Sequence, residues 1–151
     1  MTTVTTIGYQ AATVGSFLEA VREGGVGLMV DVRAVASSRR PGFSKSRLAA
    51  NLGEAGVGYV HLRALGTPAE GRAAARAGRH ARMREVYRSH LATAAAQAEL
   101  EALAELVRTG PRVCLLCFES DPAHCHRSLV AAALGALVKI RIVHLKPVDT
   151  T

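Results

Sequence analysis

The chain has 151 residues, of which 49% are hydrophobic, 21% charged and 4% aromatic, a composition that favours one domain over residues 1–151 and excludes collagen-like, disordered and low-complexity proteins. No apolar run reaches the roughly 18 residues of a membrane span, no secretory signal is present, and three cysteines form no disulfide pattern, so we expect a cytoplasmic protein without a membrane partner. The net charge of +7 comes from sixteen arginines and only three lysines, which either favours a polyanionic partner such as nucleic acid or reflects a genome rich in Arg and Ala codons.

The first half of the chain alternates predicted strands with predicted helices. Strands are expected over residues 4–9, 28–33 and 59–62, and the second is apolar up to Val32 except for Asp31, as in a strand buried on both faces. Ser16 is the expected cap of the first helix, which stops at Gly24 and Gly25. Ser44 is the expected cap of the second, which Gly56 closes.

The second half begins with a helix start at Thr67, where Pro68 and Glu70 follow a capping residue. The stretch from there to about residue 80 is expected to be a loop or a short helix. Apolar spacing then predicts one helix over residues 81–108, followed by a strand over 112–118, a helix over 127–138 and a strand over 140–145.

Alternating strands and helices predict a three-layer α/β sandwich with a mostly parallel, Rossmann-like sheet. In such sheets ligands bind beyond the carboxyl ends of the strands. Asp31 and Arg33 end the second strand on one face of the chain. The nine residues from Glu119 to Arg127, after the fourth strand, hold two carboxylates, two imidazoles, a thiol and a guanidinium. We therefore predict the functional site here, against the alternative of a solvated turn that Asp121 caps.

Short motifs along almost the whole chain resemble the family catalogued as domain of unknown function 488. They are TIGY at 6–9, VDVR at 30–33, SRRPGFSK at 38–45, GYVHL at 58–62, LG at 65–66, CFESDP at 117–122 and CHR at 125–127. Thr67 stands where the family pattern has Gly, and Phe118 where Ala is usual, and both changes alter the shape of a pocket. The resemblance implies an α/β sandwich and the position of a site, and it leaves the reaction open.

The first chemistry that these residues favour is binding of a phosphate-bearing ligand, either a nucleotide or nucleic acid. A last helix that starts near Cys125 would direct free backbone N–H groups at the strand ends. Arg127 would add charged contacts, and Arg33, Ser44 and Lys45 would join it from the other loop, with Asp31 beside them.

The second chemistry is hydrolysis of the bound ligand at an N-glycosidic or phosphoester bond. Glu119 or Asp121 would activate water, and His126 or Arg127 would stabilise the leaving group. The alternative from a different class is a binding module for nucleic acid or a nucleotide that performs no reaction. The sequence assigns no cofactor and no oligomeric state.

Thiol catalysis is a lesser alternative. Cys125 lies near a helix start between His124 and His126 and before Arg127, surroundings that lower a thiol pKa. Residues 30–33 are similar to the aspartate-containing strand of rhodanese-like domains, but the compact cysteine loop of those domains is missing.

Metal binding is the other lesser alternative. Cys114 and Cys117 form a C-x-x-C motif, but residues three apart on a strand point to opposite faces and cannot share an ion. Cys117, Cys125 and either His124 or His126 would meet only if the loop folds back, so no metal ligand is assigned.

An arginine-rich stretch follows residue 70. It contains Arg72, Arg76, Arg79, Arg82, Arg84 and Arg88 with His80 and His90. It either follows a nucleic-acid backbone, with Tyr87 as a stacking residue, or forms a solvated helix face. His61 and His144 are expected at core or rim positions, and His61 is close enough to a strand end to reach the pocket.

Overall fold

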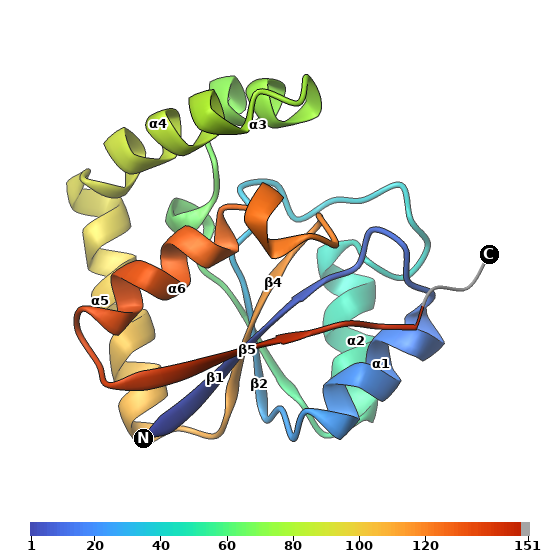
Figure 1. The fold of residues 1–151 in the computed structure, drawn as a ribbon. Helices are drawn as coiled ribbons and strands as arrows, with labels where there is room; N and C mark the ends of the chain where they lie inside the picture. The colour runs from blue at the N-terminus through green and yellow to red at the C-terminus, as the bar shows by residue number, and fades with distance from the viewer. Residues whose placement is uncertain (149–151) are drawn as a thin grey trace.

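The computed structural model describes residues 1–148, and its five strands form one parallel sheet in the order β3-β2-β4-β1-β5 (Figure 1). The strands are β1 (Thr2–Gly8), β2 (Leu28–Asp31), β3 (Gly58–His61), β4 (Val113–Cys117) and β5 (Ile140–Leu145). The register pairs Gly8 with Cys117 and Asp31 with Leu116, so the carboxyl ends of β1, β2 and β4 lie side by side. The predicted α/β sandwich with a mostly parallel sheet is confirmed.

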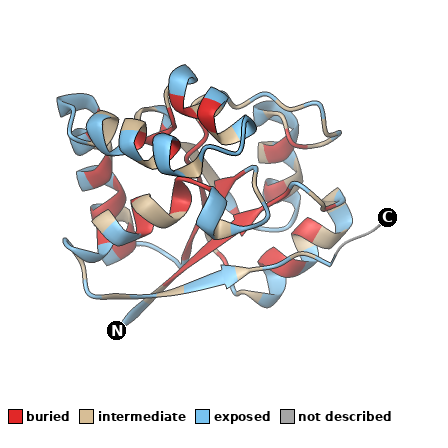
Figure 2. Ribbon diagram, turned by 45° about the horizontal axis from the view of Figure 1, so that its top comes forward, coloured by how far each residue is buried: buried red, intermediate tan, exposed pale blue. Residues whose placement is uncertain are grey.

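Helices cover both faces of this sheet. One face carries α1 (Val14–Glu23) and α2 (Lys45–Glu54), and the other carries α5 (Ala94–Thr109) and α6 (Arg127–Gly135) (Figure 1). Each helix contributes its apolar side to one of two cores, and these buried faces stand out in Figure 2. Alternate residues of β4 serve different cores, Leu115 facing α5 and α6, and Leu116 facing α1 and α2.

Two further helices, α3 (Ala69–Arg76) and α4 (His80–Leu91), lie beyond the carboxyl ends of the strands (Figure 1). Met83 and Tyr87 anchor them to the core on the side of α5. Short 3-10 turns, η1 (Arg63–Leu65) and η2 (Pro122–His124), follow β3 and β4. Within residues 1–148, no helix combines the length and apolar character that crossing a bilayer requires.

Several predicted helix boundaries were wrong. The cap of α1 is Thr13, whose hydroxyl accepts the Ser16 amide, and Ser16 completes the capping box instead of starting the helix. Pro68, not Thr67, precedes α3, and no side chain caps that helix. The continuous helix predicted over residues 81–108 is broken after α4, because Thr93 caps a new helix by accepting the Ala96 amide.

Candidate functional site

A cavity of about 870 Å³ opens at the carboxyl end of the sheet, bordered by the segments that follow β1, β2 and β4. The strands β2 and β4 are neighbours in the sheet, but β2 continues to α2 on one face and β4 continues to α6 on the other face. A crevice forms where the connections after two adjacent strands leave for opposite faces in this way. Helix α3 adds Arg72, Ala75 and Arg76 to the lining. The lining residues are Tyr9, Gln10, Arg33, Ala34, Val35, Ser37, Ser38, Arg39, Arg40, Thr67, Arg72, Ala75, Arg76, Met83, Cys117, Phe118, Glu119, His124, Cys125 and His126.

The wall of the cavity is rich in arginine. Arg39 and Arg40 come from the loop after β2, and Arg72 and Arg76 come from α3. These four guanidinium groups form no ion pair with residues 1–148, and Glu119 is the one carboxylate among the described lining residues. The cavity is therefore electropositive, which favours an anionic ligand.

Two of these arginines are partly held by backbone carbonyls. Arg72 Nη1 donates to the Thr67 carbonyl at 2.9 Å, and Arg40 Nη2 donates to the carbonyl of Ala12. Nε of Arg40 is buried without a hydrogen-bond partner in the described chain. These contacts hold the side chains in place and leave donors free for a ligand.

An aromatic surface lies beside the arginines. Phe118 follows β4 and is 39% exposed, a large fraction for so apolar a side chain. Its ring meets Tyr9 edge to face at a centroid distance of 5.4 Å, and Tyr9 stacks on Phe43 at 4.5 Å. The cavity thus offers a supported aromatic ring on which a planar group can stack.

Asp31 and Arg33, both expected to contact ligand, form a buried ion pair. Arg33 Nε and Nη2 donate to the two carboxylate oxygens of Asp31 at 2.9 and 2.7 Å, and Tyr59 donates to Asp31 Oδ2 at 2.5 Å. Arg33 Nη1 also donates to the Tyr9 hydroxyl and to the Phe43 carbonyl. Burial, and then the Asp31 carboxylate, raise the pKa of Tyr59. The ion pair fixes the loop after β2. Arg33 lines the cavity, but the Asp31 carboxylate already neutralises its charge.

Arg127, the other arginine expected to hold phosphate, has no exposed surface. Its Nε donates to the Thr6 hydroxyl at 3.1 Å, and its Nη1 and Nη2 donate to the carbonyls of Glu119 and Ser120 at 2.6 and 3.2 Å. It is absent from the lining of the cavity. Arg127 therefore positions the segment that carries Glu119.

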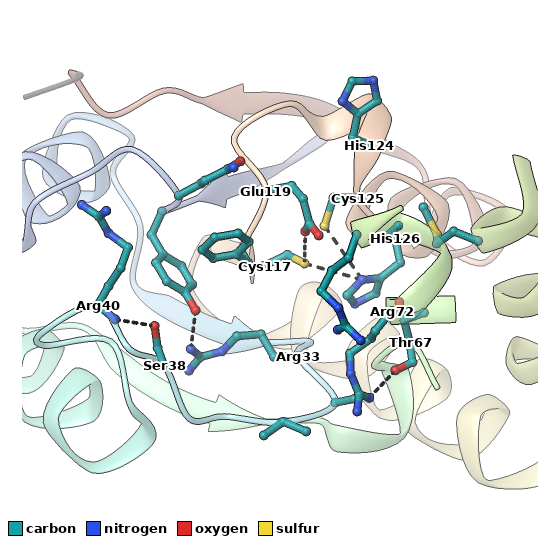
Figure 3. A pocket seen from close by; sticks show the side chains of 18 of the residues that line it. Arg33, Ser38, Arg40, Thr67, Arg72, Cys117, Glu119, His124, Cys125 and His126 are labelled. Carbon is teal, nitrogen blue, oxygen red and sulfur yellow. Dashed lines mark hydrogen bonds between the residues drawn. The ribbon is translucent and has the colours of Figure 1, made fainter. Parts of the chain in front are cut away.

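Glu119, Cys117, Cys125 and His126 converge in the wall of the cavity (Figure 3). The Cys117 thiol donates to Glu119 Oε2 at 3.3 Å, and its sulfur lies 3.5 Å from His126 Nδ1. The sulfur of Cys125 lies 3.8 Å from the same nitrogen, and His126 Nε2 lies 2.6 Å from the Val32 carbonyl. The loop does fold back, and the histidine that meets the two thiols is His126.

The electrostatics of this cluster follow from its burial. Burial, and then the neighbouring Cys117, raise the pKa of the Cys125 thiol well above its ordinary value. Burial lowers the pKa of His126, whereas the Cys125 sulfur and the Val32 carbonyl raise it, and the raising contacts prevail. Cys114 is buried in the core on the α1 and α2 side of the sheet, and burial raises its pKa to about 12.

The remaining predicted site residues lie outside the cavity lining. Asp121 is exposed and caps η2 by accepting the Ala123 amide at 2.9 Å. Ser44 precedes α2 without capping it, because its hydroxyl bonds the backbone of Ser38. The side chain of Lys45 is exposed. The last helix starts at Arg127, with His126 before it.

The arginine-rich stretch divides between two environments. Arg72 and Arg76 line the cavity, whereas Arg82 pairs with Glu70 and Glu85 on the surface. Tyr87 is no stacking residue, because it is fully buried and donates to the Leu65 carbonyl at 2.7 Å.

The histidines outside the cluster make local contacts. His61 Nε2 lies 2.7 Å from the Arg33 carbonyl, and His144 Nδ1 lies 2.6 Å from the Thr6 hydroxyl, so neither reaches the cavity. His124 lines the cavity, and its ring stacks on that of His80 at the start of α4, with a centroid distance of 4.0 Å. This stack joins η2 to the start of α4 beside the cavity.

Three residues of the cavity lining were not predicted as site residues: Phe118, Arg39 and Arg40. All three follow strands whose carboxyl ends border the cavity, so the rule that ligands bind beyond strand ends was the signal that could have found them.

The fold and the cavity define a three-layer, all-parallel α/β protein of Rossmann-like architecture with an arginine-lined pocket at its strand ends. The chain belongs to the family described as Domain of unknown function DUF488, whose model matches residues 13–134. That match covers β2, β3, β4 and α1 to α5 and most of α6. Neither the curated proteins nor the solved structures contain a match to the chain.

Proposed function

We propose that the cavity binds a nucleotide or a similar small phosphate-bearing ligand and hydrolyses it. The observation that carries this proposal is the net positive charge of the cavity wall. The described lining holds one carboxylate, that of Glu119, and four arginines without an ion pair, which are Arg39, Arg40, Arg72 and Arg76. The guanidinium fork matches phosphate oxygens in two places, so these residues suit phosphate better than a single point charge would.

The position and size of the cavity support a nucleotide in particular. Arginines reach it from two sides, from the loop after β2 and from α3, while Phe118 offers a ring for a planar base. A volume of about 870 Å³ falls within the range of small-molecule sites, and residues of α3 line one side of it. A mononucleotide fits this description better than a polynucleotide, which needs an open, continuous groove.

Glu119 is the residue that we assign as general base. It is half-buried in the wall, whereas Asp121, the other candidate, caps η2 outside the lining. Glu119 would accept a proton from water as the water oxygen attacks an N-glycosidic carbon or a phosphorus atom of the ligand. The leaving group then departs with the bonding electron pair and takes up a proton from solvent or from the protonated Glu119, which returns to its carboxylate form.

Binding is tested by calorimetric titration with a nucleoside 5′-monophosphate and with the same nucleoside without phosphate. We expect the monophosphate to bind at least about tenfold more tightly, since a charge-assisted contact contributes about 1.5–3 kcal/mol. Arg76→Gln should weaken binding of the monophosphate and leave binding of the unphosphorylated nucleoside unchanged. Arg88→Gln, on the exposed part of α4, should bind both ligands with wild-type affinity. Equal affinities for the two ligands, or equal effects of the two variants, would contradict the proposal.

Hydrolysis is tested on the same ligand by detecting free base, or nucleoside and inorganic phosphate. Glu119→Gln should abolish turnover while affinity stays close to that of the wild type, because the shape is kept and the base is lost. Asp121→Asn is the matched control and should keep turnover. A wild-type protein that binds the ligand without converting it is a binding module, and the hydrolytic part of the proposal then fails.

A further inference from the structure

Three side chains that ligate metals in other proteins meet in the wall of the cavity. One ligand atom from each of Cys117, Cys125 and His126 lies within 4.8 Å of the other two, and all three residues are buried (Figure 3). Cys117 ends β4, and the other two lie between η2 and α6, so the turn of the chain after β4 brings them together.

The two sulfur-to-nitrogen distances match those of a tetrahedral zinc site. With Zn–S near 2.3 Å and Zn–N near 2.0 Å, sulfur and nitrogen ligands of one ion lie about 3.5 Å apart. The sulfur of Cys117 is 3.5 Å from His126 Nδ1, and the sulfur of Cys125 is 3.8 Å from it. Small side-chain shifts are therefore enough to place all three atoms around one ion.

The surroundings of His126 orient the ring for this role. Its Nε2 lies 2.6 Å from the Val32 carbonyl, a contact in which Nε2 carries the hydrogen and Nδ1 presents its lone pair to the sulfurs. Ligating histidines in proteins are held by this kind of second hydrogen bond. The ring of Tyr87 packs against the imidazole at a centroid distance of 5.1 Å and restricts its rotation.

The donor set selects the metal. Two thiolates and an imidazole suit zinc, whereas magnesium and calcium require oxygen ligands. The sequence contains no second C-x-x-C or Cys/His pair at this place to complete a closed structural site. Three protein ligands beside a cavity, with a further position free for water, form the pattern of catalytic zinc.

We propose that Cys117, Cys125 and His126 bind one Zn²⁺ whose fourth position faces the cavity. Binding displaces the two thiol protons, including the one that Cys117 donates to Glu119 Oε2, and so frees that carboxylate. Zinc binding stands on the cluster alone. The use of the zinc ion in hydrolysis rests on the proposed function. A water molecule on the fourth position of the ion would lie beside Glu119, and the Glu119 carboxylate would take a proton from that water.

The test starts from the purified 151-residue protein, stripped of metal by a chelator and reduced. Titration with Co²⁺ should give one ion per chain, with the visible absorption of a tetrahedral site and sulfur-to-metal charge transfer, and one equivalent of Zn²⁺ should remove the colour. Competition with a chromophoric chelator then gives the zinc affinity. Cys117→Ala and Cys125→Ala should each weaken it by more than about 100-fold, because loss of even an outer-shell partner costs 10–100-fold.

Cys114→Ala is the matched control. It also removes a buried thiol from β4, but on the opposite face of the sheet, so its zinc affinity should equal that of the wild type. Circular dichroism of each metal-free variant shows whether it is folded, and the cobalt spectrum of the wild type decides the question even if one variant is not. A colourless cobalt complex, or an equal loss of affinity in all three variants, would overturn the proposal.

Glu119→Gln separates the two proposals. This variant keeps all three ligands, so it should still bind one Co²⁺ per chain with the tetrahedral spectrum, and the loss of the carboxylate beside Cys117 should weaken zinc binding by no more than the roughly 10–100-fold of an outer-shell change. Wild-type protein that holds zinc in the cysteine cluster but binds no nucleotide would overturn the proposed function and leave the metal site standing.

Discussion

At the scale of single residues, the buried pair of Asp31 and Arg33 is the clearest case of a charged group used for structure. Both side chains are almost fully buried, and every carboxylate oxygen of Asp31 is occupied. Alternation along a strand predicted that the two residues share a face. It could not predict that they bind each other, because that depends on how the loop after β2 closes over them.

Asp31→Ala should lower the free energy of unfolding by about 3–5 kcal/mol, because it leaves the Arg33 guanidinium buried without a counter-charge. Chemical denaturation followed by circular dichroism measures the change. The control is Glu19→Ala, which breaks the exposed ion pair with Arg22 and should change stability little. Similar losses in the two variants would show that the buried pair has no special structural role.

The cap at Asp121 predicts a pH dependence. The Ala123 amide, above all, lowers the pKa of the Asp121 carboxyl. Its contribution to stability is therefore present above the ordinary carboxyl pKa and is lost as the pH falls through the lowered value of the folded state. Unfolding of wild type and Asp121→Ala should differ near neutral pH and converge in acid. A difference that grows in acid would contradict this assignment.

At the scale of elements, the segment after β4 is held against β1 by close backbone packing. A Cβ on Gly8 would lie 1.8 Å from the Glu119 carbonyl oxygen and 3.1 Å from Arg127 Nη1. Arg127 donates to that same carbonyl, so β1, this segment and α6 fix one another. The position of Glu119 in the cavity wall depends on this contact.

Gly8→Ala should therefore destabilise the protein by about 1–3 kcal/mol, as overpacking does, and should displace Glu119. Gly53→Ala in α2 is the control, since nothing lies within 4 Å of the added Cβ, and it should stabilise the helix by about 0.5–1 kcal/mol. Thermal unfolding of both variants gives the comparison. A Gly8→Ala variant with the thermal stability of the wild type would mean that the segment after β4 moves freely.

At the scale of the whole molecule, the sequence predicted the strands and the parallel sheet well, because apolar runs that alternate with helical spacing are local signals. It could not predict the break before Thr93, since apolar spacing continues through both α4 and α5. The strand order is also non-local. The sequence thus pointed to the strand ends that border the cavity, without indicating that α3 contributes Arg72 and Arg76 to its lining.

Non-local contacts also decide which of the predicted site residues face the cavity. Sequence proximity grouped Glu119, Asp121 and Arg127, but their side chains face the cavity, solvent and the interior, respectively. Direction of this kind depends on the turn at η2 and on the contacts of each side chain. The sequence allowed Cys117 and Cys125 to meet a histidine if the loop folds back, but it did not indicate whether the loop does so or whether the histidine is His124 or His126.

We propose above all that the carboxyl end of the sheet binds a phosphate-bearing ligand. The most direct measurement is a heteronuclear NMR titration of the labelled protein with a nucleoside 5′-monophosphate. We expect saturable shifts of the Phe118 and Glu119 amides and of the Arg72 and Arg76 guanidinium resonances, with the amino ends of the strands unaffected. Shifts confined to surface residues such as Arg84 and Arg88, or none at saturating ligand, would contradict it.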